Sequence, residues 1–175
     1  MKVETAFVTD PELEDRYESH GNVAVEEVEL DEPKDNEVLI DIEACGVCHS
    51  DWHVASGDAP MRHYPAAIGH EAAGTVEQVG DAVTHVEEGD SIVTSYIPCC
   101  GKCEPCSQGY QELCVRGQYL EKGPMMDGTF RYHRQEVEED IGQFVLLGVF
   151  SEKAVVHKDS VVPVKIGRAS CRERV

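Results

Sequence analysis

The sequence predicts a mainly β protein built around an antiparallel β-barrel. Short segments of alternating or apolar character recur along its 175 residues, and turn residues separate them. Many short strands at short intervals are typical of a barrel. No segment shows the succession of strand and long helix that builds a doubly wound sheet. A lobe of closely spaced cysteines further predicts that a metal ion stabilises part of the domain.

The first half of the chain is expected to hold most of the strands. The polar segment 10–22 contains Pro11 and Gly21, so we expect a loop there. In 37–44, apolar residues alternate with acids up to Ala44, which predicts a strand with one buried face. Strand character is found at 1–9, 23–30, 37–44, 72–79 and 91–95.

The remaining elements are shorter or less regular. Residues 50–56 fit a short helix that ends at Gly57. The segment 120–139 is polar and contains Gly-Pro and Asp-Gly turns, so we expect an exposed excursion. Strand character returns at 144–150, 153–157 and 160–164.

The charge balance argues against two classes of partner. Thirty-four acids against fifteen Lys and Arg give a net charge of −19. Such a surface repels phosphate, so we expect no nucleic acid and no anionic membrane as partner. The same charge fits either a highly soluble acidic protein or one adapted to high salt, where ions screen the self-repulsion.

The N-terminal residues and the hydropathy pattern bear on localisation. Residues 1–5 lack the apolar region of a signal peptide, and no apolar run approaches the ~20 residues that span a bilayer. We therefore expect a cytoplasmic protein. In a reducing compartment, its eight cysteines are more often metal ligands or catalytic groups than disulfides.

Four cysteines form the strongest motif. Within a lobe at 96–116, Cys100, Cys103, Cys106 and Cys114 follow the pattern C-x2-C-x2-C-x7-C. Zinc binds four such donors tetrahedrally, and four protein donors leave no position for water, so the site is predicted to be structural. An iron–sulfur cluster and reduced cysteines without metal are the alternatives. The surrounding chain favours zinc.

The other cysteines receive no metal. Cys45 and Cys99 lie outside the four-cysteine pattern and are interpreted as packed, small apolar residues. Cys171 lies in 165–175, a segment that is rich in basic residues and lacks an amphipathic period. We interpret 165–175 as a non-native tail, the translation of a sequencing adapter, with a natural basic tail as the alternative.

The combined motifs resemble a known family. Cys48, the Gly-His-Glu at 69–71 and the cysteine lobe, in this order, resemble the catalytic domain of zinc-dependent medium-chain alcohol dehydrogenases. The resemblance covers 1–164 and implies a GroES-like barrel. The segment 127–131 resembles the nicotinoprotein-type branch, and the thiol-dependent formaldehyde dehydrogenases are close neighbours.

The resemblance implies roles around a catalytic zinc. Cys48 and His70 match two of its ligands, and Glu71 matches a carboxylate that can approach the metal. Asp51 matches the acid that orients the histidine ligand. Ser50 matches the hydroxyl that takes the proton from the bound alcohol.

Three histidine and tyrosine assignments complete this site. His53 matches the next member of the proton relay, His49 a position near the cofactor's pyrophosphate, and Tyr96 a residue that lines the substrate pocket. Taken singly, several residues assigned to this site also have simpler structural explanations. Ser50 fits a helix N-cap, Asp51 fits a first-turn acid, and the two histidines fit a solvated surface.

The predicted function is that of an N-terminal fragment of a zinc-dependent oxidoreductase. The resemblance implies hydride transfer from an alcohol or hemithioacetal to NAD(P), the nicotinamide accepting the hydride. The chain has no G-x-G-x-x-G after a strand, so we expect the Rossmann domain and the third zinc ligand to be absent. The fragment alone is then expected to be inactive.

The full-length protein is expected to be a homo-oligomer that acts on a small alcohol or aldehyde. A zinc-stabilised GroES-like binding module without catalysis is the alternative. A zinc-ribbon protein that binds nucleic acid is disfavoured by the charge.

Overall fold

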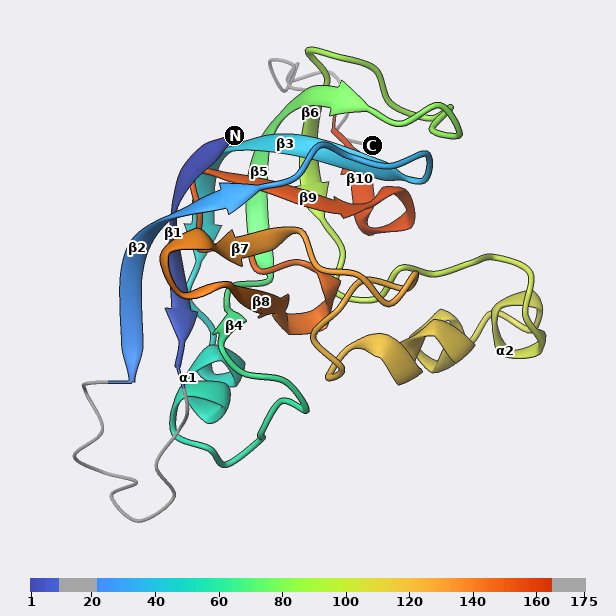
Figure 1. Ribbon diagram of the computed structural model, residues 1–175. Coiled ribbons are helices and arrows are strands. Elements are labelled where there is room, and N and C mark those ends of the chain that lie inside the picture. Colours follow the sequence, from blue (N-terminus) through green and yellow to red (C-terminus); the bar gives the residue numbers. More distant parts are fainter. Residues whose placement is uncertain (10–21, 165–175) are drawn as a thin grey trace, which may run out of the picture.

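The computed structural model describes residues 1–9 and 22–164, which form two β-sheets around a shared apolar core (Figure 1). Except for Asn22, the predicted loop at 10–22 lies outside the described residues. The predicted tail at 165–175 also lies outside them.

The first sheet closes into a barrel with the strand order β1-β2-β7-β8-β4. Its strands are β1 (Lys2–Val8), β2 (Val23–Leu30), β4 (Ala66–Ala67), β7 (Tyr132–Arg134) and β8 (Glu139–Gln143). Strand β4 closes the barrel because it pairs with both β1 and β8. The pairing of β4 with β8 is parallel and the other pairs are antiparallel, so the predicted mainly β barrel is confirmed.

The second sheet has five strands in the order β10-β6-β5-β3-β9. They are β3 (Glu37–Gly46), β5 (Glu71–Val79), β6 (Ser91–Thr94), β9 (Lys153–His157) and β10 (Val161–Pro163). The register of β3 against β5 shifts between Ile42 and Ala44. This irregularity breaks the predicted alternation and leaves Ala44 exposed, as a bulge does.

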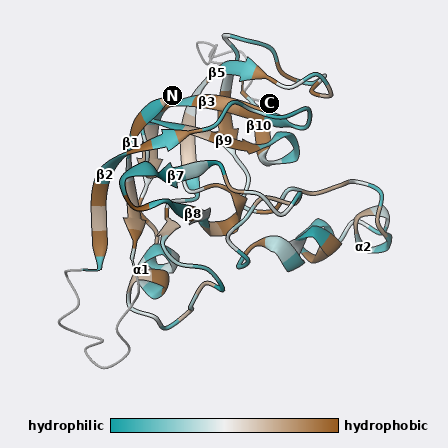
Figure 2. Cartoon of the chain, viewed as in Figure 1, coloured by the Kyte–Doolittle hydropathy of each residue, from teal (hydrophilic) through white to brown (hydrophobic). Residues whose placement is uncertain are grey.

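The helices are short. They are α1 (His49–Ala55), α2 (Glu104–Ser107), η1 (Gln111–Leu113), η2 (Val115–Tyr119), η3 (Gln135–Val137), η4 (Phe144–Leu146) and η5 (Lys158–Ser160). Hydrophobic residues line β1, β2 and β9 in Figure 2, and the buried core draws on both sheets. Across 1–9 and 22–164, no helix has the length and apolar character that crossing a membrane requires.

Two predictions for the second half were wrong. The segment 120–139 is not an exposed excursion, because it contains β7 and completely buries Arg131 and Tyr132. The segment 144–150 is not a strand but turns at η4, where Val145 and Leu146 have φ values of 51° and 63°. Apolar composition alone cannot distinguish a buried strand from a buried turn.

Candidate metal centres

The cysteine lobe brings four sulfur atoms together. The Sγ atoms of Cys100, Cys103, Cys106 and Cys114 all lie within 4.8 Å of one another. Two backbone N–H groups point at this cluster, since Cys103 N donates to Cys100 Sγ and Cys100 N to Cys114 Sγ, both at 3.4 Å. Such bonds stabilise thiolates, the form that binds a metal.

Without a bound cation, two cysteines of the lobe have very different pKa values. Hydrogen bonds from the backbone N–H groups of Lys102 and Cys103 lower the pKa of Cys100 to about 6. Burial, followed by the Cys103 thiolate, raises the pKa of Cys106 to about 12. A divalent cation would remove this conflict, because it stabilises all four thiolates at once.

The lobe projects from the two sheets, with α2 at its far end (Figure 1). Arg116 ties it back to the second sheet. Its guanidinium donates to Pro98 O at 3.2 Å and forms an ion pair with Asp159 in η5.

The second donor cluster lies where β3 ends and β5 begins, near α1. Cys48, His70 and Glu71 offer a sulfur, a nitrogen and an oxygen that lie within 4.8 Å of one another. His70 Nε2 and Glu71 Oε1 are 3.8 Å apart. Cys48 directly precedes α1, and Glu71 begins β5 opposite Gly46 of β3.

Asp51 contacts both the Cys48 side and the His70 side of this cluster. Its carboxylate accepts hydrogen bonds from Cys48 N at 3.0 Å and Gly69 N at 2.9 Å, and it lies 3.2 Å from His70 Nδ1. Asp51 and His70 are both buried. Because Nδ1–H is directed to Asp51, the Nε2 lone pair of a neutral His70 is free to bind a metal.

The pKa values reflect this contact. Burial acts to raise the pKa of Asp51, but the hydrogen bonds from His70 and Cys48 outweigh it and leave the pKa below its usual value. The Asp51 hydrogen bond in turn raises the pKa of His70. Hydrogen bonds from Ser50 lower the pKa of Cys48, which favours its thiolate.

The predicted relay residues lie on α1. Ser50 Oγ is 3.6 Å from Cys48 Sγ. His49 Nδ1 and His53 Nε2 are 3.0 Å apart, so one ring donates to the other. His53 Nδ1 also lies 3.6 Å from Asp58 Oδ2. No hydrogen bond joins Ser50 to His53 among the described residues.

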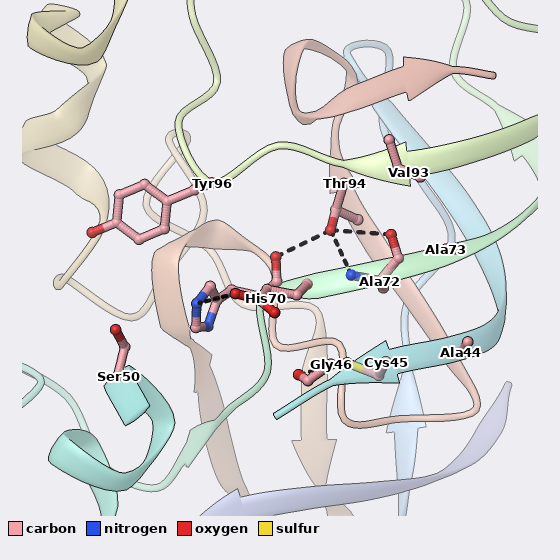
Figure 3. A pocket seen from close by; sticks show the side chains of 11 residues that line it. Ala44, Cys45, Gly46, Ser50, His70, Ala72, Ala73, Val93, Thr94 and Tyr96 are labelled. Carbon is pink, nitrogen blue, oxygen red and sulfur yellow. Dashed lines mark hydrogen bonds and ion pairs between the residues drawn. The ribbon is translucent and has the colours of Figure 1, made fainter. Parts of the chain in front are cut away.

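A cavity of about 750 Å³ opens beside the Cys48–His70–Glu71 cluster. Figure 3 shows Ser50, His70 and Tyr96 around the same space. The ring centroids of His70 and Tyr96 are 5.9 Å apart. Strand residues form the rest of the wall: Ala44, Cys45, Gly46, Glu71, Ala72, Ala73, Val93 and Thr94.

The structure therefore gathers most of the residues that the sequence singled out. Those around the cluster and cavity are Cys48, Ser50, Asp51, His70, Glu71 and Tyr96. His49 is exposed and faces His53 across the helix surface. Sequence reasoning missed Thr94 in the cavity wall and Phe144, whose ring centroid lies 5.4 Å from that of His70.

The barrel and the two donor clusters together define a β-domain equipped to bind metal ions. Residues 34–166 match the model of the alcohol dehydrogenase GroES-like domain. The chain belongs to the alcohol dehydrogenase family, as its motifs predicted.

Named relatives agree with this assignment. The chain is 46% identical over 140 residues to the NDMA-dependent alcohol dehydrogenase of Amycolatopsis methanolica, covering 80% of this chain and 37% of that protein. It is 42% identical over 149 residues to the S-(hydroxymethyl)glutathione dehydrogenase of Saccharomyces cerevisiae, covering 85% of this chain and 38% of the yeast protein.

A solved structure has the same fold. An alcohol dehydrogenase zinc-binding domain protein from Burkholderia ambifaria superposes with a TM-score of 0.82 at 26% identity, covering 95% of this chain and 42% of that one. The chain thus spans well under half the length of the proteins that it matches.

Proposed function

We propose that this chain forms the metal-binding and substrate-binding part of a zinc- and NAD(P)-dependent oxidoreductase acting on a small alcohol or hemithioacetal. The observation that carries the proposal is the Cys48–His70–Glu71 cluster beside an open cavity. A sulfur, an imidazole nitrogen and a carboxylate oxygen form a donor set that suits zinc, and three donors leave a position for substrate. Bound zinc lowers the pKa of a hydroxyl group that it contacts.

The chain's own residues would prepare this site. Asp51 holds the His70 ring and leaves Nε2 directed at the cluster. Ser50 would accept the substrate's hydroxyl proton, and His53 would be the next member of the relay towards solvent. His49, 3.0 Å from His53, would lie near the cofactor's pyrophosphate. Tyr96 would form an aromatic wall of the substrate pocket.

Glu71 would supply the third donor when this chain stands alone. The family resemblance implies a further ligand outside this chain, but the Glu71 carboxylate already lies at the cluster. The isolated chain would then bind the metal without completing a hydride-transfer site, since no G-x-G-x-x-G follows a strand in its sequence. We propose 1–164 as the domain, with the zinc lobe at 96–116 and 165–175 as a foreign tail.

The four-cysteine lobe would hold a second, structural zinc. Its sulfurs fill all four positions, so its role is to fold the lobe rather than to bind substrate.

Cobalt titration tests this proposal, because Co²⁺ bound to thiolates absorbs visible light. We expect the metal-free chain to bind two Co²⁺ ions, the tighter one in the lobe. Cys48→Ala and His70→Ala should each remove the second ion and leave the first. Cys45→Ala is the matched control, because Cys45 lines the same cavity without being a donor.

Two results would overturn the proposal. One is a parent chain that binds a single ion. The other is a second ion that remains bound in both Cys48→Ala and His70→Ala. A one-metal chain would favour a zinc-stabilised binding module without catalysis.

A further inference from the structure

We propose that Thr94 is a positioning residue, whose hydroxyl fixes the backbone between His70 and Ala72 and thereby places His70 and Glu71. This inference rests on the proposed function, because it concerns the same metal centre. Thr94 lies at the end of β6 and is half-buried in the cavity wall.

The β-ladder explains why this position needs a side chain. Strand β5 pairs with β6 from Thr75↔Ser91 to Ala73↔Val93, and the pairing stops there. Beyond this point β6 ends at Thr94, and its other edge continues along β10, since Ser95 N donates to Ser160 O at 2.7 Å just before β10 begins. Glu71 and Ala72 at the start of β5, and His70 just before it, therefore have no ladder pairing with β6.

The Thr94 hydroxyl takes the place of that pairing. Ala72 N donates to Thr94 Oγ1 at 2.8 Å, and the hydroxyl hydrogen of Thr94 can be donated to His70 O at 3.1 Å or to Ala72 O at 3.4 Å (Figure 3). One hydroxyl thus spans the peptide groups on both sides of Glu71. A buried N–H or C=O left without a partner is destabilising, which favours the observed backbone path.

The other side of Glu71 is fixed by β3. Gly46 pairs with Glu71, and a Cβ at position 46 would lie 2.6 Å from Glu71 Oε2. The carboxylate therefore lies directly over a glycine on one side, while Thr94 holds its backbone on the other. The positions of His70, just before β5, and of Glu71, its first residue, depend on these contacts of Gly46 and Thr94.

Thr94 also links the metal centre to the substrate wall. Tyr96 follows it by two residues, after the end of β6, and its ring stands edge-on to the His70 ring. A fixed Thr94 therefore sets the separation between the His70 ligand and the Tyr96 wall.

The test compares three variants of the full chain. Thr94→Val keeps the shape and removes the hydroxyl, and Thr94→Ser keeps the hydroxyl. Thr75→Val is the matched control, because it removes a hydroxyl of the same sheet that bonds the exposed Glu43 instead. Binding of Co²⁺ at the Cys48 cluster is the readout, and the cysteine lobe of the same molecule serves as internal reference.

We expect Thr94→Val to weaken Co²⁺ binding at the cluster about tenfold or more, as loss of a group that supports a ligand does. Binding in the lobe should not change. Thr94→Ser and Thr75→Val should bind like the parent. In the metal-free protein, hydrogen exchange of the Ala72 amide should accelerate in Thr94→Val only.

The outcomes separate the two proposals. A parent that binds one ion defeats the proposed function and the role of Thr94 with it. A parent that binds two ions, with Thr94→Val equally tight at both, overturns the role of Thr94 alone. Equal weakening at both sites in Thr94→Val also overturns it, because it would reveal a general loss of stability.

Discussion

Gly69 is the residue at which backbone geometry and the proposed metal centre meet. Its φ is +90°, and its N–H donates to Asp51 at 2.9 Å. Its carbonyl accepts from Val149 N at 3.1 Å. A Cβ at this position would lie 2.6 Å from Phe150 N. Both the sign of φ and the lack of space therefore require glycine immediately before His70.

We predict that Gly69→Ala destabilises the protein by more than about 3 kcal/mol, since left-handed strain and a backbone clash add. Gly89→Ala is the control, because Gly89 has a φ of +89° but nothing within 4 Å of an added Cβ. Gly89→Ala should lose stability through backbone strain alone, by about 1–2 kcal/mol. Urea denaturation of the metal-loaded variants measures both. Equal losses of stability in the two variants would show that Phe150 moves away from the added methyl group without an energetic cost.

Individual residues differ in how far sequence could place them. Cys48 and the four lobe cysteines stand in short motifs, so their spacing predicts clusters. His70 also has a motif, but its contact with Asp51 spans nineteen positions and came only through family resemblance. Thr94 and Phe144 have no such signal. Thr94 lies in the cavity wall just past the last β5–β6 pair, Ala73↔Val93. Phe144 packs near His70 where the chain turns through the positive φ values of Val145 and Leu146.

At the scale of elements, a buried charge cluster attaches the segment before β7 to β3. Arg131 is completely buried, and its guanidinium donates to both oxygens of Glu37 at 2.8 and 2.6 Å. It also reaches Asp127 at 3.0 Å, which Lys34 contacts at 2.7 Å. Partial burial acts to raise the pKa of Asp127, but the bonds from Lys34, Thr129 and Arg131 hold it well below its usual range.

We predict that Arg131→Met destabilises the protein by about 3–5 kcal/mol, because it leaves the Glu37 carboxylate buried without its cation. Glu37→Gln in the same chain should recover part of this loss. Arg134→Met is the control from β7, where the ion pairs with Glu26 and Glu139 are only partly buried and contribute about 1 kcal/mol or less each. Chemical denaturation of the singles and the double variant gives the coupling. Additive losses would argue against a direct interaction.

This cluster explains why the sequence misplaced an element. The segment 120–139 is polar, and polar segments are expected to lie at the surface. Arg131 is nevertheless buried, because its partner Glu37 lies ninety-four positions away on β3. Local composition does not contain that pairing. By contrast, 23–30 and 153–157 carry their strand signal in their own apolar residues, and the strands end where predicted.

At the scale of the whole molecule, acids greatly outnumber bases. The net charge is −19, and several cations are already paired with acids: Lys2 with Glu27, Lys34 with Asp127, Arg131 with Glu37, and Lys153 with Glu77. The acids in excess therefore have no Lys or Arg to balance them. Their repulsion opposes the compact state.

Added salt has two opposite effects on such a molecule. It weakens the exposed ion pairs, each worth about 1 kcal/mol or less. It also shortens the Debye length from about 10 Å at 0.1 M to about 3 Å at 1 M, which screens repulsion among all excess acids. Since the excess acids outnumber the paired ones, relief of repulsion should dominate. We predict that NaCl raises the melting temperature by a few degrees, about 1 kcal/mol or more of added stability.

Calorimetry of the metal-loaded chain between 0.1 and 1 M NaCl measures this shift. A variant with Glu32→Gln, Asp81→Asn and Glu88→Gln removes three exposed acids. It should melt higher than the parent at low salt, and the gap should narrow at high salt, because screening and neutralisation relieve the same repulsion. A melting temperature that falls with salt would show instead that the exposed ion pairs outweigh the net charge, and the acidic surface would then serve solubility rather than stability in high salt.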